Sequence, residues 1–401
     1  MQDSLRHRWV PLPAAIAVAF MLICSSGPCD WPMLRHDASR SGRSDEPGPE
    51  LSAIAWSRDL GSPVDSSPAV VGGRVLVGTI DGTFWAVDQA DGAVIWQASL
   101  GSPIVSSPCV AGERVVFGSV DGSLYGLDVG SGEVVWTART GGPVVASPLL
   151  AGDLVLCGST DGRLYALDAQ TGAVAWTTVA DGEIYAGAAA SGDVVVYAND
   201  RGTVHCVSLA DGAGVWARPY RADGPVVSCP VIHATSVIVS SLAPTSLTPR
   251  DSLNIHCIDL ATGKRVWGAR GRNPWATDKE KGFSVAASPT MAGEQVWFVT
   301  MEGYGNWSAA LRSLELATGV RGALVRKRSQ GRAISVGDSS AAIAGTVLYL
   351  TDYTGELFSI DTATARPLGS IALGALTRSS PAISGGAAFV GTNDGRLLCV
   401  R

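Results

Sequence analysis

The sequence is poor in charged residues. Only 16% of its 401 residues are Asp, Glu, Lys or Arg, and the net charge is −6. There is no strongly basic domain, which argues against a protein that coats nucleic acid. Hydrophobic residues make up 46% of the chain, which excludes a disordered protein because so many apolar side chains can form a core.

Motifs that mark common enzymes and metal proteins are also missing. The eight cysteines include no Cys-x-x-Cys and no adjacent pair, so there is no zinc, haem or redox signature. The chain has no nucleophile elbow, phosphate-binding Gly loop, His-Glu zinc helix or calcium loop. We therefore predict no metal and no cofactor, and interpret Cys206, Cys257 and Cys399 as small packing residues.

The first 30 residues are typical of an export signal. A basic stretch at residues 6–8 precedes an uncharged apolar run of 14 residues, Val10–Ile23. This run is short for a membrane span, so we predict a cleaved signal peptide, with an uncleaved anchor as the alternative. Ile23 and Pro28 precede the two cysteines of this region, where a lipoprotein signal requires a small residue, which argues against lipidation. We expect the protein in the periplasm or cell envelope.

The rest of the chain repeats itself. Ser66–Trp96, Ser106–Trp136 and Ala146–Trp176 align without gaps at a spacing of 40 residues. Within each copy, short β-branched runs alternate with Gly-Gly, Asp-Gly and Thr-Gly pairs, a pattern typical of β-hairpins. Each copy is predicted to be a four-stranded antiparallel meander, and this period indicates a blade of a β-propeller.

One column of small residues counts the blades. The residue two positions before the end of the third strand recurs eight times, as Ala86, Gly126, Ala166, Cys206, Cys257, Ser313, Ser359 and Cys399. We therefore predict an all-β, eight-bladed propeller, in which close packing of neighbouring sheets demands small side chains. The eighth blade ends with the chain after three strands, so the segment around Trp56 is predicted to supply its outer strand. The propeller would span residues 51–401, after a lead-in segment at residues 31–50.

A second column places tryptophan on the outermost strand. Its members are Trp56, Trp96, Trp136, Trp176, Trp216 and Trp267. We predict that these side chains have a structural role between blades. Blades six and seven depart from the column, with Ala323 and Gly369 at this position.

Together the columns give the pattern small-x-Asp-x-x-x-Gly-x-x-x-Trp, as at Ala86, Asp88, Gly92 and Trp96. This pattern resembles the tryptophan-docking repeat of the pyrroloquinoline-quinone-like β-propellers. Residues 31–44 are similar to the stretch that opens many bacterial members of that superfamily. For the fold this resemblance is strong, but one fold hosts many functions.

The resemblance implies two alternative roles. Quinoprotein dehydrogenases of this superfamily hold the quinone over the channel, typically with an adjacent Cys-Cys disulfide on one side, a Trp on the other and a calcium ion bound by carboxylates. BamB-like envelope propellers are non-enzymatic scaffolds. Because adjacent cysteines are missing and the blades are short, we expect a monomeric, non-enzymatic scaffold that binds a protein or peptide partner. A quinone-binding oxidoreductase or ligand sensor is the alternative.

Four insertions are expected on one face of the propeller. Residues 241–252 and 301–309 lengthen second-to-third strand turns, and residues 269–285 and 324–338 lengthen links between blades. In a four-stranded blade these turns and links emerge on the same face. Long loops on a rigid scaffold often carry function.

The insertions combine aromatic and basic residues. The predicted partner-binding residues are Trp275, Tyr304, Trp307, Arg326, Lys327 and Arg328. Aromatic side chains beside arginines are typical of protein-binding surfaces, so we predict an acidic or extended partner. The alternative is that the aromatics hold the loops down and the basic run is only solvated.

Charged residues are also expected at the mouth of the channel. At the entry to the innermost strand most blades carry an apolar residue, but blades one, seven and eight carry Asp65, Asp338 and Arg378. These blades are consecutive around a closed ring, so the three side chains should line part of the mouth. They could form a ligand or acid–base site, or a structural ion pair where the chain ends meet.

Two histidines occupy a column that otherwise holds packing aromatics. His205 and His256 align with Trp85, Tyr125 and Tyr165. We interpret both as substitutes for an aromatic side chain, with metal ligation as the alternative.

Overall fold

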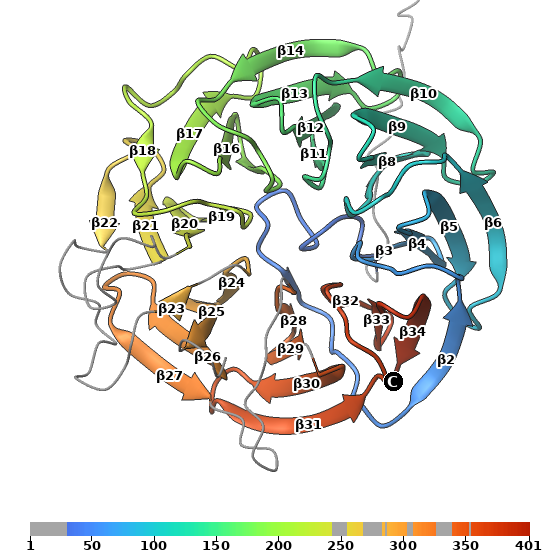
Figure 1. Cartoon of the computed structure of the whole chain (residues 1–401). Helices are drawn as coiled ribbons and strands as arrows, with labels where there is room; N and C mark the ends of the chain where they lie inside the picture. Colours follow the sequence, from blue (N-terminus) through green and yellow to red (C-terminus); the bar gives the residue numbers. More distant parts are fainter. Residues whose placement is uncertain are drawn as a thin grey trace, which may run out of the picture.

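The computed structural model describes residues 30–242, 255–267, 283–284, 287–302, 308–325, 339–352 and 354–401. In these residues eight antiparallel sheets stand around a central axis, which confirms the predicted eight-bladed β-propeller (Figure 1). No helix among them is long and apolar enough to cross a lipid bilayer.

The first four blades each contain four consecutive strands. Blade one comprises β3 (Ala69–Val71), β4 (Arg74–Gly78), β5 (Thr83–Asp88) and β6 (Val94–Ser99). Blade two comprises β7 (Cys109–Ala111), β8 (Arg114–Gly118), β9 (Ser123–Asp128) and β10 (Val134–Arg139). Blade three comprises β11 (Leu149–Ala151), β12 (Leu154–Gly158), β13 (Arg163–Asp168) and β14 (Val174–Val179). Blade four comprises β15 (Ala189–Ser191), β16 (Val194–Ala198), β17 (Thr203–Ser208) and β18 (Tyr220–Arg221).

Two of the last four blades, seven and eight, contain a strand from the N-terminal part of the chain. Blade five comprises β19 (Val231–His233), β20 (Ser236–Ser240), β21 (Ile255–Asp259) and β22 (Arg265–Trp267). Blade six comprises β24 (Thr290–Ala292), β25 (Gln295–Glu302), β26 (Ser308–Glu315) and β27 (Arg321–Val325), with β23 (Phe283–Ser284) added to β25. Blade seven comprises β28 (Ala342–Ala344), β29 (Val347–Thr351), β30 (Glu356–Asp361) and β31 (Arg366–Ala372), with β1 (Arg43–Ser44) parallel to β28. Blade eight comprises β32 (Ala382–Ser384), β33 (Ala387–Gly391), β34 (Arg396–Val400) and β2 (Ile54–Asp59).

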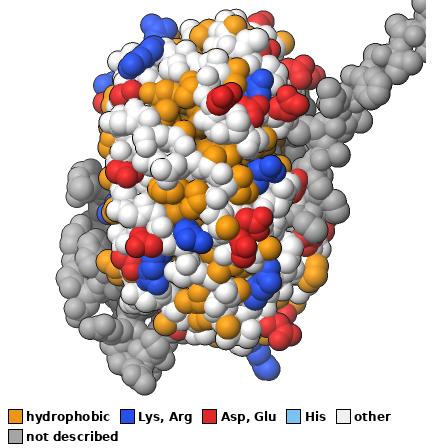
Figure 2. Space-filling view, turned by 90° about the vertical axis from the view of Figure 1, so that its right-hand side faces the viewer, with side chains coloured by type: hydrophobic (Ala, Val, Ile, Leu, Met, Phe, Trp, Pro, Cys, Tyr) orange, Lys and Arg blue, Asp and Glu red, His pale blue; other side chains and the backbone are white. Residues whose placement is uncertain are grey.

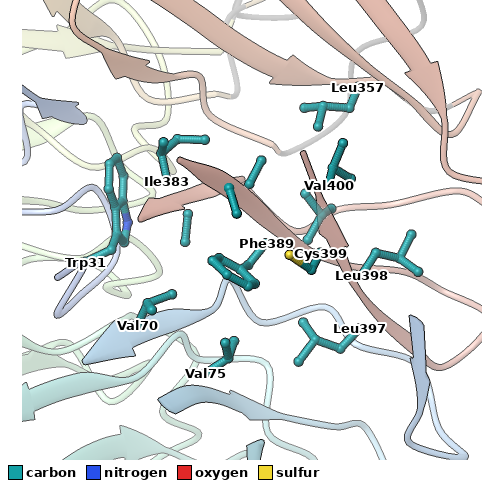
Figure 3. Packing of buried hydrophobic residues seen from close by; sticks show 14 of the residues in the cluster. Trp31, Val70, Val75, Leu357, Ile383, Phe389, Leu397, Leu398, Cys399 and Val400 are labelled. Carbon is teal, nitrogen blue, oxygen red and sulfur yellow. The ribbon is translucent and has the colours of Figure 1, made fainter. Parts of the chain in front are cut away.

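The ring closes between the two ends of the chain. Strand β2 pairs with β34 in antiparallel register, with Trp56 opposite Cys399 as predicted (Figure 1). The cluster at this seam joins Val70 of blade one to Ile383 and Phe389 of blade eight (Figure 3). Burial of these apolar side chains stabilises the closed ring.

The tryptophan column forms the contacts between blades. The Trp136 indole is 8% exposed, and its Nε1 donates a hydrogen bond of 3.2 Å to the Ala169 carbonyl of the next blade. A Cβ on Gly126 or Gly172 would lie within 2.5 Å of this ring, so only glycine fits on either side of it. The other five indoles make the same bond to the next blade, to the carbonyl groups of Gln89, Val129, Leu209, Leu260 and Leu316.

The two blades without tryptophan differ for identifiable reasons. Ala323 of blade six packs in the same hydrophobic cluster as Ala365 of blade seven. Ala365 occupies the position of the repeat that Gly92 holds in blade one, in the turn between the third and fourth strands. Beyond blade seven no such turn exists, because the junction of the chain ends stands in its place. There Ser52 and Ala53 donate backbone hydrogen bonds to the Arg401 carbonyl.

The outer wall of the propeller mixes apolar and charged side chains (Figure 2). Val94, Ile95, Val134 and Val135 begin the outermost strands β6 and β10, and each is more than 40% exposed. In the view of Figure 2, charged side chains are interspersed among the hydrophobic ones.

Candidate functional site

The first part of the lead-in segment, residues 31–44, crosses the centre of the ring (Figure 1). Its backbone pairs with the inner strands of six blades, through Trp31–Val70, Pro32–Val110, Ala38–Ala190, Ser39–Ile232, Ser41–Met291 and Gly42–Ile343. These contacts close the central channel below its mouth. The sequence identified this segment as a lead-in but did not predict its path.

Two buried arginines fix the segment in the channel. The Arg40 side chain is fully buried and donates hydrogen bonds to the carbonyl groups of Ser147, Pro148 and Ala188 at 2.8–2.9 Å. Arg35 donates to Ala341 at 2.9 Å and to the Pro289 carbonyl. Burial lowers the pKa of Arg35 to about 10, so this guanidinium is still charged at neutral pH.

Asp37 supplies a negative charge within the same segment. Burial alone would raise the pKa of its carboxyl group, but hydrogen bonds from His36, Ser41 and Ser39 lower this pKa to about 2. Residues 34–42 therefore carry the two guanidinium charges of Arg35 and Arg40 and one carboxylate. One positive charge remains uncompensated within this stretch.

A ring of serines lies above the segment. The serine belt consists of Ser67, Ser107, Ser147, Ser288, Ser340 and Ser380. The hydroxyl oxygen of each accepts a hydrogen bond of 2.8–3.0 Å from the backbone N–H of the preceding blade. The two other blades have Gly187 and Cys229 at this position. A Cβ on Gly187 would lie 2.8 Å from the Ser147 carbonyl oxygen and 2.9 Å from Arg40 Nη2, so these two groups together leave no room for a side chain there.

The serine belt lines a cavity of about 520 Å3 at the mouth of the channel. Leu34 of the lead-in segment contributes to the lining, and Val105, Val145 and Tyr185 lie at the entries to the inner strands of blades two to four. The Tyr185 ring is 41% exposed. The volume is within the range of small-ligand sites.

Asp65 and Arg378 line the same cavity. Arg378 Nη1 is 3.4 Å from Asp65 Oδ2. The other carboxylate oxygen, Oδ1, is buried and has no hydrogen-bond partner among the described residues. Asp338, the third residue expected at this mouth, lies outside the described residues, so the structure does not test the three-residue cluster.

The mouth opens on the face where the links between blades run. In six of the blades the described second-to-third strand turn is bonded to the preceding link, as in Ile80 N–H to the Pro63 carbonyl and Leu242 N–H to the Pro225 carbonyl. We name this side of the molecule the link face. The four predicted insertions connect described strands at this face, and their attachment points lie in blades five to seven, on one part of the ring.

The predicted partner-binding residues are not part of the described chain. Trp275, Tyr304, Trp307, Arg326, Lys327 and Arg328 all lie outside the described residues. Within the insertions the structure adds one feature that sequence reasoning missed. Residues 283–284 form β23, which pairs with the extended strand β25.

The two histidines lie within blade packing. His256 is buried, and its ring nitrogens bond the hydroxyl groups of Tyr220 at 3.0 Å and Ser241 at 3.2 Å. Burial, together with the nearby charge of Arg265, lowers the pKa of His256 to about 3. His205 stacks on Tyr197 with ring centroids 4.8 Å apart. No group of three or more His, Cys, Asp or Glu among the described residues is arranged to hold a metal ion.

The cavity differs from the arrangement expected for a bound quinone. The described lining contains one carboxylate, Asp65, and one cation, Arg378, and these two face each other. Both guanidinium groups below the floor bind backbone carbonyls. The sequence has no adjacent cysteine pair. The described residues therefore do not fit the disulfide, tryptophan and calcium arrangement of the quinoprotein dehydrogenases.

Comparisons with known proteins agree with the β-propeller repeat found in the sequence. The family model of the outer membrane protein assembly factor BamB matches residues 49–184. A search of curated proteins finds no match to the chain.

Among solved structures, BamB from Moraxella catarrhalis is similar over 86% of this chain and 96% of its own, with 16% identity and a TM-score of 0.66. The quinohemoprotein alcohol dehydrogenase from Comamonas testosteroni is similar over 93% of this chain and 81% of its own, with 15% identity and a TM-score of 0.71. At these identities the likeness to solved structures shows the fold alone, and it does not separate a scaffold from an oxidoreductase. The docking repeats, the closed ring and the family match over residues 49–184 show the repeat and the fold of the pyrroloquinoline-quinone-like β-propellers.

Proposed function

We propose that this propeller is a non-enzymatic binding protein of the bacterial cell envelope, which holds a protein or peptide partner at its link face. The observation that carries the proposal is the cavity at the channel mouth. It is closed below by the lead-in segment, and it opens on the face to which the four insertions attach. Such a surface can receive a protruding part of a partner while the inserted loops contact the rest.

The chemistry of the cavity favours binding over catalysis. Its described wall consists of hydroxyl groups, valines and one tyrosine around a single Asp–Arg pair. Aromatic and basic residues in the insertions would add the contacts typical of a protein interface. The match to the BamB family model and the predicted export signal support a place in the envelope.

The proposal is tested by charge reversal at Arg326, Lys327 and Arg328, followed by affinity purification from envelope extract. We expect partner recovery to fall at least about fivefold, because loss of rim charges weakens electrostatic steering and complementarity. The matched control reverses Arg74, Lys264 and Arg366, which lie at first-to-second or third-to-fourth strand turns of the opposite face. Unchanged recovery in the first variant, or equal loss in both, would count against the link face.

The quinone-dependent oxidoreductase remains a second candidate because the fold extends over 93% of this chain in a quinohemoprotein dehydrogenase. Titration of the full chain with pyrroloquinoline quinone and calcium distinguishes the two. We expect no absorbance change and no dye-linked alcohol oxidation. Saturable quinone binding with activity would replace the scaffold by an enzyme.

A further inference from the structure

We propose that the channel mouth receives the C-terminal end of an extended peptide, with its carboxylate directed at the serine belt. This inference rests on the proposed function and specifies which part of the partner enters the cavity. Three observations carry it: hydroxyl groups without an acceptor, an uncompensated positive charge below the floor, and a carboxylate oxygen without a donor at the rim.

The serine belt offers hydrogen-bond donors to the cavity. Each of its six hydroxyl oxygens already accepts a backbone hydrogen bond. No described group accepts a bond from any of these hydroxyls, and five of the six serines are more than nine-tenths buried. A hydroxyl is both a donor and an acceptor. A ligand that accepts hydrogen bonds from these hydroxyl groups must therefore supply acceptor oxygens.

The charge below the belt favours an anionic acceptor. Arg40 Nη2 lies directly behind Gly187 of the cavity wall. Arg35, Arg40 and Asp37 together carry a net charge of one positive unit. Both guanidinium groups are buried, so solvent screens their field little. A carboxylate with four acceptor sites is suited to this combination of hydroxyl donors and positive potential.

The rim of the cavity offers an acceptor oxygen, to which a simple carboxylate could not donate a hydrogen bond. Asp65 Oδ1 is buried without a described donor, while Oδ2 faces Arg378. A peptide supplies backbone N–H groups at a short distance from its terminal carboxylate. One such N–H could satisfy Oδ1, while Val105, Val145 and Tyr185 contact apolar side chains. This pairing of acceptors at the floor with a donor at the rim indicates a peptide terminus.

The experiment measures peptide binding to the mature full-length chain by calorimetry. The probe is acetyl-Ala-Val-Ala with a free carboxylate, compared with the same peptide as an amide and with acetyl-Ala-Glu-Ala-amide. We expect the free acid to bind at least about tenfold more tightly than either amide, as is typical for charge-assisted hydrogen bonds. Equal affinity of acid and amide, tighter binding of the internal Glu, or no binding of the acid at millimolar concentration would overturn the inference.

Variants of the belt separate recognition from stability. Ser107→Cys should weaken acid binding about threefold or more, because a thiol is a weak donor. Cys229, at the equivalent position of blade five, shows that a thiol fits there. The matched control is Ser106→Cys, since the neighbouring Ser106 hydroxyl is bonded to the Ala146 carbonyl and does not line the cavity. Cys229→Ser adds a hydroxyl and should tighten binding. Equal loss in the Ser106 and Ser107 variants would contradict the inference.

Failure of this inference and failure of the proposed function are distinguishable. If acid and amide bind alike while the charge-reversed loops still lose the envelope partner, the link face remains the binding surface and only the carboxylate assignment fails. If the loop variant retains its partner, the proposed function itself fails.

Discussion

At the scale of single residues, each docking tryptophan packs against a glycine of the next blade, and Trp136 also packs against one on its own sheet. The Trp136 ring covers Gly126 on its own sheet and Gly172 on the next. Gly172 has a φ of +71°, and a Cβ there would lie 2.5 Å from the ring. The glycines of the repeat are therefore needed for close packing as well as for their backbone conformation.

Replacing Trp136 by Ala should cost about 3–5 kcal/mol, the usual range for a large buried side chain. Gly172→Ala should cost about 2–4 kcal/mol, because it combines backbone strain with a steric clash. The double variant should cost less than the sum, since the space left by the indole accepts the new methyl group. Urea unfolding measures all three values.

A second glycine provides the control for this cycle. Gly152 has a φ of +58° and no atom within 4 Å of its missing Cβ. Gly152→Ala should therefore lower the free energy of unfolding by only about 1 kcal/mol, the cost of placing alanine at a positive φ. Equal costs for Gly152→Ala and Gly172→Ala would show that the indole does not determine the glycine.

The buried His256 should make the protein sensitive to mild acid. Its pKa is about 3 in the fold and 6.5 when unperturbed, so below pH 6.5 the unfolded chain binds a proton that the folded chain does not. Stability is therefore unaffected by this group above pH 6.5 and is lost at about 1.4 kcal/mol per pH unit as the pH falls toward 3.

His256→Phe separates this effect from general acid denaturation. The variant loses the bonds to Tyr220 and Ser241, so it should be less stable at pH 7 by about 1–3 kcal/mol. It lacks the titrating group, so the difference from the natural protein should narrow between pH 6.5 and about 4. Unfolding by urea at a series of pH values measures this difference. A constant difference over the range would contradict the assignment.

At the scale of elements, the lead-in segment is held in the channel by side chains that bond to backbone carbonyls. Arg40 alone donates hydrogen bonds to carbonyl groups of blade three, of blade four and of Leu34 in its own segment. The segment therefore acts as an internal support for the inner strands. It also forms part of the floor of the candidate site through Leu34.

Arg40→Met should cost at least about 3 kcal/mol, because several buried carbonyl groups lose their donor together. Arg43→Met is the matched control in the same segment. Arg43 pairs with Asp45, and their side chains are 42% and 90% exposed, so its loss should cost less than about 1 kcal/mol. Thermal unfolding of both variants measures the contrast. Equal shifts in Tm would show that Arg40 does not fix the segment.

At the scale of the whole molecule, the sequence predicted the ring because every blade repeats the same small set of constraints. The Trp and small-residue columns identified the number of blades and the closure of β2 onto β34. The path of residues 31–44 could not be predicted, because this segment occurs once and pairs with a different blade at almost every step.

The candidate site was only partly visible in the sequence. Asp65 and Arg378 stood out because they break an apolar column, and they face each other in the structure at 3.4 Å. The serine column is also present in the repeats, but its role in a cavity depends on ring closure, which brings Ser67 to Ser380 across 313 positions. The insertions carry no repeat, so their chemistry was the only guide to their role.

The most direct test of the account is site-specific photo-cross-linking in living cells. A photo-reactive aromatic residue replaces Tyr185, which lines the channel mouth, or Val135, which is 46% exposed on the outer wall. We predict that position 185 forms an adduct with an envelope polypeptide and that position 135 does not. Adducts at position 135 with none at position 185 would contradict a binding site at the link face.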